Sequence, residues 1–174
     1  MIISTKAIVL RKIKYSDSSL IVDTFTELEG RKSFFIKGIL GKTKGKIKNS
    51  HFQPLSQILI KYNKREKKKI NFLIECKINR HCQNLYLDYR KSSIILFLNE
   101  ILNMCLVEET GNKELFFFLE TSFKWLDESD KISNFHIKFI LDLLKYLGIN
   151  PRLKSSKSNF LSFENGSFEE KKPD

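Results

Sequence analysis

Cysteine is scarce in this chain of 174 residues, which contains only Cys76, Cys82 and Cys105. An odd number of cysteines without a Cys-x-x-Cys pair argues against a disulfide framework and against a structural zinc site. Cys76, His81 and Cys82 lie close together in the sequence, but a fourth ligand at metal spacing is missing. We therefore expect reduced thiols, no metal and no cofactor.

Long apolar runs are also missing. No uninterrupted apolar stretch approaches the roughly 20 residues that a membrane-spanning helix needs. The first fifteen residues, MIISTKAIVLRKIKY, do not have the order of a basic segment, an apolar run and a small-residue cleavage site. The expectation is a soluble cytoplasmic protein with no membrane partner.

Catalytic motifs are absent as well. The chain has no GxxxxGK[ST], GxGxxG or HExxH motif, and its three histidines have no serine or cysteine arranged beside them as a nucleophile. The glycine-rich stretch at 37–55, KGILGKTKGKIKNSHFQPL, has the lysine of a phosphate-binding loop without its spacing. We expect a protein that is not an enzyme.

Positive charge is abundant, with a net charge of +11. A single alanine and an excess of lysine over arginine indicate AT-rich codons, so total charge alone is weak evidence of binding. The distribution is more informative. Residues 1–80 carry 19 basic and 6 acidic residues, a net charge of +13, whereas residues 81–174 carry 12 and 14, a net charge of −2. This contrast predicts a basic module followed by a neutral one.

The first module reads as five short strands. They are predicted at 6–13, 19–25, 31–39, 55–62 and 70–78, with the longest connection between the third and the fourth. This pattern fits a five-stranded barrel of the OB type, and an SH3-like barrel is the structural alternative. In the fifth strand, alternation predicts that Ile70, Phe72, Ile74, Cys76 and Ile78 share one face.

The second module reads as helices at 89–109, 113–128 and 134–147, with Asn112 and Ser133 as expected N-caps. The stripe of the first predicted helix contains Ile94, Leu98, Ile101, Leu102 and Cys105. A hairpin is predicted at 160–170 around an Asn-Gly pair. The fold class is therefore α+β, with an OB-type domain at 1–80 and a helical domain at 81–174 that ends in a short hairpin.

Basic residues gather where an OB barrel binds its ligands, around the loops that join strands one and two and strands four and five. We call the predicted DNA-binding set the basic collar: Lys12, Lys14, Tyr15, Arg31, Lys32, Lys37, Lys42, Lys44, Lys46, Lys48, Lys64, Arg65, Lys67, Lys68 and Lys69. Such a collar would follow a phosphate backbone and release counterions on binding. A solvated, lysine-rich surface without a ligand is the alternative.

Aromatic residues within this module could stack on unpaired bases. The candidates are Tyr15, Phe34, Phe35, His51 and Phe52. Phe34 and Phe35 are adjacent on a strand and must point to opposite faces, so one of them is expected in the core.

The N-terminal run TKAIVLRKIKYSDSSLIVDTFTELEGRKSFFIKGI resembles the start of the RecO family of bacterial recombination mediators. The residues that carry the resemblance are Tyr15, Asp17, Ser18, Ile21, Val22, Phe25, Thr26, Gly30, Lys37 and Gly38. Three further segments resemble later parts of the family: FQPLSQILI (52–60), DYRKSSIILFLNEIL (88–102) and NFHIKFILDLLKYLGINP (134–151). The sequence is most similar to the Bacteroidetes branch of the family.

The resemblance implies an OB domain and a helical domain that together bind single- and double-stranded DNA and anneal complementary strands. It also implies helping RecA onto strands coated with single-strand-binding protein (SSB), together with RecR and through the acidic C-terminal tail of SSB. Residues 152–166 lack the four-cysteine zinc motif of some members. Family members continue beyond residue 174, so the helical domain is expected to be shortened.

Two other hypotheses come from different functional classes. In the first, the helical half is an adaptor that docks a partner peptide, and DNA contact is incidental. In the second, the chain is an OB-type RNA-binding or translation factor. Annealing assays and a comparison of RNA and DNA affinity would separate these hypotheses from a recombination mediator.

Overall fold

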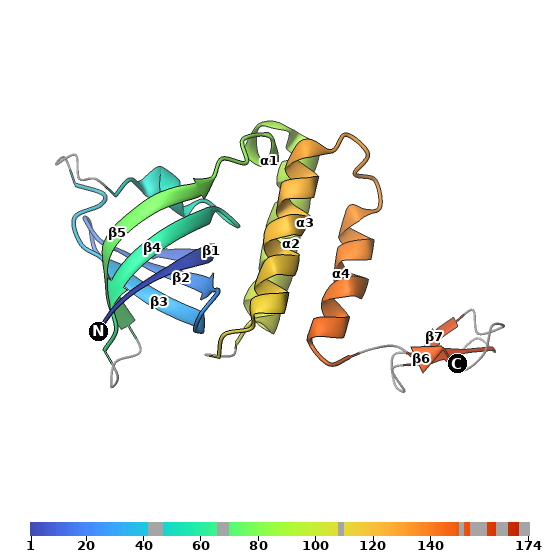
Figure 1. The fold of residues 1–174 in the computed structure, drawn as a ribbon. Coiled ribbons are helices and arrows are strands. Elements are labelled where there is room, and N and C mark those ends of the chain that lie inside the picture. Colours follow the sequence, from blue (N-terminus) through green and yellow to red (C-terminus); the bar gives the residue numbers. More distant parts are fainter. Residues whose placement is uncertain are drawn as a thin grey trace. The chain divides into compact units, whose positions relative to one another are not determined.

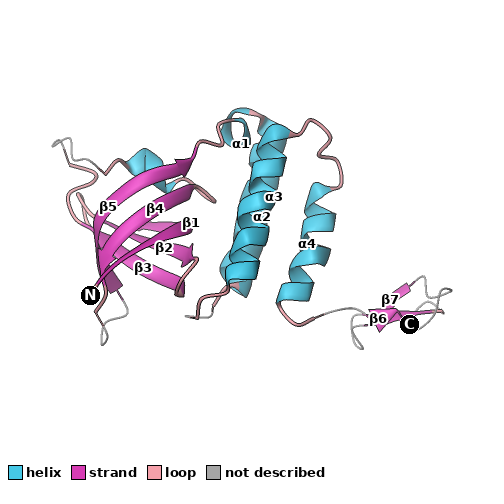
Figure 2. Ribbon diagram, in the orientation of Figure 1, coloured by secondary structure: helices cyan, strands magenta, loops and turns pink. Residues whose placement is uncertain are grey.

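The computed structural model describes residues 1–41, 47–65, 70–107, 110–149, 152–153, 160–162 and 167–170. Figures 1 and 2 show an N-terminal barrel, a set of helices and a small C-terminal sheet. The first part contains β1 (Ile2–Lys14), β2 (Leu20–Thr26), β3 (Gly30–Ile36), the 3-10 helix η1 (Asn49–Phe52), β4 (Gln57–Asn63) and β5 (Ile70–Arg80). It continues with α1 (Asn84–Leu87), α2 (Tyr89–Cys105), α3 (Lys113–Glu128), α4 (Phe135–Tyr146), β6 (Arg152–Leu153), β7 (Phe160–Ser162) and β8 (Ser167–Glu169).

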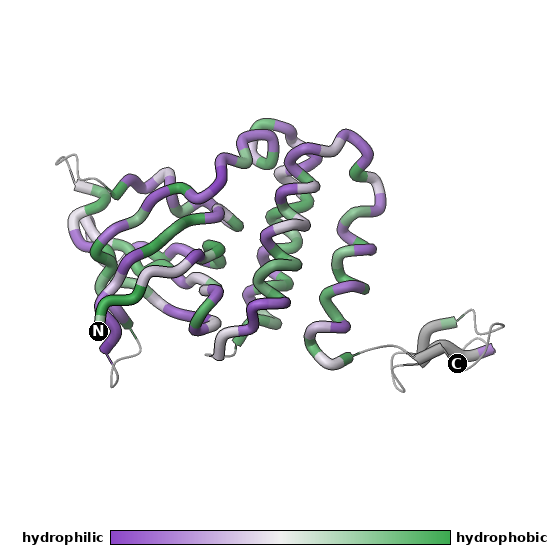
Figure 3. The backbone as a smooth tube through the Cα atoms, in the orientation of Figure 1, coloured by the Kyte–Doolittle hydropathy of each residue, from purple (hydrophilic) through white to green (hydrophobic). Residues whose placement is uncertain are grey.

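The first five strands close into a barrel in the order β1-β2-β3-β5-β4. All neighbouring pairs are antiparallel except β3 and β5, which are parallel. A closed five-stranded barrel of this order is the OB type rather than the SH3-like alternative. The core includes Val22, Phe34, Phe52, Ile60 and Tyr62. Figure 3 shows hydrophobic and hydrophilic residues interleaved along the strands and helices, as expected for elements with one buried face.

The predicted face of β5 is wrong for its first half. Asn71 is buried there, whereas Ile70, Phe72 and Ile74 point outward and are more than one third exposed. The register with β4 shifts between Lys61 and Tyr62, so Ile74 is an extra residue without a partner. Because such a bulge reverses the alternation, Cys76 returns to the core beyond it.

Helices α2 and α3 begin where side chains can cap them. Asp88 accepts a hydrogen bond from the backbone N–H of Arg90 (2.8 Å), and Asn112 accepts one from that of Leu115 (2.9 Å), as predicted for Asn112. The buried stripe of α2 is rotated from the prediction, because Ile95 is buried in place of Ile94.

The chain divides into two compact units, residues 1–133 and 134–174. In the second unit, the N-cap residue of α4 is Asn134 rather than the predicted Ser133, and the Asn134 side chain makes no capping hydrogen bond. The sheet of this unit has the order β6-β8-β7, in which β7 and β8 are antiparallel as the predicted hairpin requires. The Asn-Gly pair of that hairpin lies outside the described residues. No helix in the described parts of the chain is long and apolar enough to cross a membrane.

Gly111 lies against the turn between β2 and β3. A Cβ atom at this position would stand 2.2 Å from the carbonyl oxygen of Leu28 and 3.1 Å from that of Glu27. Because these neighbours are backbone atoms, Gly111→Ala is expected to lower the free energy of unfolding by about 1–3 kcal/mol. Urea denaturation of the variant measures this loss.

Gly41→Ala is the matched control, because among the described residues its Cβ atom would meet the Gly38 carbonyl oxygen alone, at 3.3 Å. Equal stability losses in the two variants would contradict a steric role for Gly111.

Candidate nucleic-acid interface

An apolar row crosses the outer surface of four barrel strands. Ile13 on β1 pairs with Ile21 on β2, Ile21 with Phe35 on β3, and Phe35 with Phe72 on β5. The flanking residues Val22 and Phe34 are core residues, so Ile21 and Phe35 must point outward. Neighbouring outward residues thus form one continuous surface, with its aromatic rings on β3 and β5.

One loop extends this surface with a ring contact. Tyr15, in the loop between β1 and β2, packs edge-to-face on Phe35 with ring centroids 5.4 Å apart. Phe35 packs in the same manner on Phe72, at 5.6 Å. We call Tyr15, Phe35 and Phe72 the aromatic row. Tyr15 is 66% exposed and Phe72 is 43% exposed, so their rings remain available to a ligand.

A cationic side chain stands over one end of the aromatic row. The guanidinium carbon of Arg65, beyond β4, lies 4.5 Å from the centroid of the Phe72 ring. Lys14 lies beside Tyr15 in the sequence, and its Nζ is 3.2 Å from Asp17. Exposed aromatic rings beside cationic side chains can stack on bases and neutralise the phosphates between them.

The start of the connection between β3 and β4 lies against the loop that carries Tyr15. The backbone N–H of Leu40 donates to the carbonyl of Ser18 (3.0 Å), and Gly38 adopts a φ of +74° that permits this turn. Lys37, which is exposed, follows Ile36 directly after β3. Tyr15 and Lys37 therefore come from two loops that touch, and Lys14 is the last residue of β1 before the first of them.

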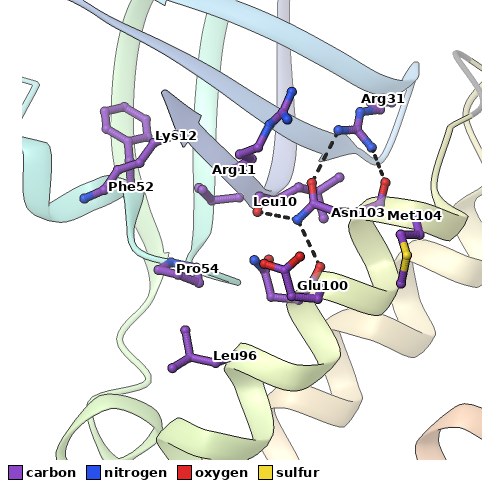
Figure 4. Close-up of a pocket in the computed structure, with 12 residues that line it drawn as sticks. Leu10, Arg11, Lys12, Arg31, Phe52, Pro54, Leu96, Glu100, Asn103 and Met104 are labelled. Carbon is purple, nitrogen blue, oxygen red and sulfur yellow. Dashed lines mark hydrogen bonds between the residues drawn. The ribbon is translucent and has the colours of Figure 1, made fainter. Parts of the chain in front are cut away.

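Arg31, a member of the basic collar, lies at the contact between the barrel and α2 (Figure 4). Its guanidinium donates to the carbonyl oxygens of Asn103 (2.8 Å) and Leu106 (3.0 Å) at the C-terminal end of α2, and to Asp23 (3.3 Å). Asn103 in turn donates to the carbonyl oxygen of Leu10 (2.8 Å). Arg31 is thus engaged in joining the barrel to the helix.

Lys64 and Lys32 lie near the carboxylate of Glu29 at the turn between β2 and β3. Lys64 and the Tyr62 hydroxyl both donate to Glu29. Burial alone would raise the pKa of Glu29, but the hydrogen bonds from Lys64 and Tyr62 and the charge of Lys32 hold this pKa below its usual value. Lys64 is therefore engaged in an ion pair with Glu29.

The remaining predicted residues occupy different places. Lys12, at the end of β1, donates to the Asn49 side chain (3.4 Å), and Lys48 precedes η1. Phe34 and Phe52 are 1% exposed and belong to the core, so neither can stack on a base. Lys42, Lys44, Lys46, Lys67, Lys68 and Lys69 lie outside the described residues.

Phe72 was not among the predicted stacking residues, because the alternation placed it on the same face of β5 as Cys76. The signal that could have found it is local: Phe72 follows the charged loop at 64–69 by only a few residues. The bulge at Ile74 concealed this signal by shifting the alternation of the strand.

The chain was also compared with known proteins. The family model described as "Recombination protein O N terminal" matches residues 1–81, and "Recombination protein O C terminal" matches residues 86–172. Proteins named DNA repair protein RecO are similar to it. The one from Christiangramia forsetii is 41% identical over 88% of this chain, and the one from Flavobacterium psychrophilum is 38% identical over 97%.

These alignments cover 64% and 71% of the two relatives, respectively, so the chain spans about two thirds of their length. A third relative, from Phocaeicola vulgatus, is 36% identical over 99% of this chain and 72% of its own. The family matches cover nearly the whole chain and include the closed barrel and the helices that follow it. They confirm the resemblance seen in the sequence: the chain belongs to the RecO family.

Proposed function

We propose that this chain is a DNA-binding recombination mediator that acts in DNA repair without catalysing a reaction. The observation that carries the proposal is the aromatic row, which is exposed on the outer face of an OB barrel and lies beside cationic side chains in a member of the RecO family. Unpaired bases stack on such a surface, while duplex DNA offers only its backbone.

The binding residues within the described chain are Tyr15, Phe35 and Phe72 for the bases and Lys14, Lys37 and Arg65 for the phosphates. The lysines of the basic collar outside the described residues would add affinity by their number. The ammonium group of lysine is a point charge and lacks the planar array of donors that the guanidinium group of arginine presents. A lysine-rich interface therefore binds the phosphate backbone and distinguishes little between bases.

We propose that residues 1–80 bind DNA and that residues 81–174 contact the protein partners. The activity would be cytoplasmic and would comprise annealing of complementary strands and delivery of RecA to SSB-coated single strands. RecR and the C-terminal tail of SSB are the proposed protein partners.

The salt dependence of binding tests the electrostatic part of this proposal. The logarithm of the association constant for a thymidine oligonucleotide should fall linearly with the logarithm of salt concentration, by about 0.7 per neutralised phosphate. Replacing both Lys37 and Arg65 with glutamine should make the slope shallower by about 1.4, because two contacts are lost. Fluorescence anisotropy across a salt series measures both slopes.

The control for this pair is the double variant Lys113→Gln and Lys124→Gln, which removes the same charge from exposed positions on α3. Its slope should match that of the unmodified chain. Affinity that does not respond to salt would contradict the proposed phosphate contacts.

An annealing assay on SSB-coated complementary strands, with and without RecR, separates the mediator from its alternatives. The test variant replaces Arg65, Lys67, Lys68 and Lys69 with glutamine and leaves Lys64 in place, because Lys64 pairs with Glu29. A mediator should lose annealing in this variant, whereas an adaptor with incidental DNA contact should keep it. Comparable affinity for structured RNA without any annealing would favour an RNA-binding factor instead.

A further inference from the structure

A concave site lies at the other end of β5 from the aromatic row. It is a cavity of about 290 Å³ between η1, the start of β4, the end of β5 and α1. Phe72 and Arg80 are eight residues apart on β5, which corresponds to roughly 25 Å along the strand. The cavity and the aromatic row are therefore two separate places on the first unit.

The lining of this cavity is basic. Lys48, His51, Arg80 and His81 line it together with polar side chains such as Ser50 and Gln83, and no carboxylate is found among the described lining residues. Outside the lining, Glu128 on α3 lies 3.9 Å from Arg80 and is more than half exposed. By contrast, the cavity of about 440 Å³ between β1 and α2 includes Glu100 in its lining (Figure 4).

His51 has an unusual electrostatic environment within this cavity. Burial, together with the positive charges of Lys48 and His81, lowers the pKa of His51 below its usual value. Its Nδ1 atom is buried and has no hydrogen-bond partner among the described residues. The other titratable groups that line the cavity are Arg80, Cys82 and Tyr86. Asp127 and Glu128 on α3 also act on Cys82 electrostatically.

We propose that this cavity, lined by Lys48, His51, Arg80 and His81, binds a phosphate group of a DNA strand at a distance from the aromatic row. Four cationic or protonatable side chains converge on one concave site, and several hydroxyl and amide groups beside them can donate further hydrogen bonds. The assignment to DNA rests on the proposed function, but the affinity of the cavity for an anion does not.

The lysine-rich connection between β3 and β4 links this cavity to the predicted DNA-binding residues. Lys48 is the last lysine of that stretch and lies at the cavity. A strand that lies on the aromatic row could continue to this cavity, or a second strand could occupy it. In both cases, the two sites together would hold DNA over a longer path than the aromatic row alone.

Histidine NMR tests the anion site without any DNA. The chain contains only three histidines, so their imidazole signals can be resolved, and His136 on α4 does not line the cavity. Inorganic sulfate, whose charge is constant between about pH 5 and 8, should shift the signals of His51 and His81 at low salt. It should also raise the pKa of His51, because a bound anion favours the imidazolium form. The His136 signal should not move beyond the effect of the same ionic strength of chloride.

The source of the phosphate is distinguished with a thymidine oligonucleotide long enough to span both sites. If the cavity holds the DNA backbone, Arg80→Gln combined with His81→Gln should weaken binding of this oligonucleotide about tenfold. The same variant should bind a very short thymidine oligonucleotide, which needs only the aromatic row, with unchanged affinity. Lys124→Gln is the charge-matched control on α3.

The outcomes separate this inference from the proposed function. If sulfate shifts all three histidines equally, or none of them, no anion site exists in the cavity, although DNA binding at the aromatic row could still be intact. If sulfate binds but the Arg80/His81 variant keeps its affinity for the long oligonucleotide, the cavity is a site for a free anion, and its assignment to DNA is wrong.

Discussion

Replacing both Tyr15 and Phe72 with alanine is expected to weaken the binding of single-stranded DNA by about 100-fold. A base stacked on an aromatic side chain contributes about 1–3 kcal/mol, so each single substitution should cost about 5- to 150-fold in Kd. Both residues are classed as exposed, contact Phe35 edge-to-face and lie outside the barrel core, so their removal leaves no cavity in that core. Fluorescence anisotropy with a labelled thymidine oligonucleotide measures the loss, and urea denaturation checks that stability is retained.

Duplex DNA provides the discriminating comparison. Its bases are paired and cannot reach the aromatic row, so the double alanine variant should bind a hairpin duplex with nearly the affinity of the unmodified chain. Phe117→Ala is the matched control, because Phe117 is an exposed phenylalanine on α3, outside the barrel. An equal loss of single-strand and duplex binding would mean that charge alone holds DNA at this face.

Most of the barrel could be predicted because its strands obey local rules. Short β-branched runs separated by turn residues predicted the five strands, and adjacency forced Phe34 and Phe35 to opposite faces. The alternation rule failed only at β5, where the extra residue Ile74 reverses the inward and outward positions. A bulge depends on the partner strand, so the sequence of β5 alone does not reveal it.

The candidate site was less predictable because it depends on residues that are distant in the sequence. Tyr15, Phe35 and Phe72 meet only because β3 pairs with β5 in parallel across the closure of the barrel. Arg31 could not be distinguished from the exposed lysines by sequence, because its partners, Asn103 and Leu106, lie more than 70 residues away. Charge counting identifies the basic module but does not show which cations already have partners.

Arg31 and its neighbours form a network that is expected to control stability. Asp23 on β2 is buried and accepts hydrogen bonds from Ser33 (2.6 Å), Arg11 (3.0 Å) and Arg31 (3.3 Å). Burial alone would raise the pKa of Asp23, but these hydrogen bonds outweigh it and lower the pKa below its usual value. A carboxylate whose pKa is lowered by folding stabilises the folded state wherever it is ionised.

Asp23→Asn is therefore expected to lower the free energy of unfolding at neutral pH by on the order of 3 kcal/mol, because it leaves the half-buried Arg31 without its carboxylate. For a chain of this size, that loss corresponds to a Tm lower by roughly 6–12 °C. Arg31→Gln should cost a similar amount, since it also releases the carbonyl groups at the end of α2. Arg11→Gln is the control: the Arg11 side chain is 56% exposed, so the loss should stay below about 1 kcal/mol.

The pH dependence shows whether the Asp23 charge is responsible. The stabilisation by Asp23 is fully present above the ordinary aspartate pKa of 3.8 and is lost as the pH falls through the lower pKa of the folded state. The stability difference between the unmodified chain and Asp23→Asn should therefore be constant near neutral pH and shrink in acid below that value, as urea denaturation across a pH series would show. A difference that persists unchanged in acid would mean that packing, rather than charge, holds Asp23 in place. The Arg31→Gln variant, once folded, should also keep the salt slope of DNA binding, because a guanidinium bound to Asp23 and α2 does not neutralise a phosphate.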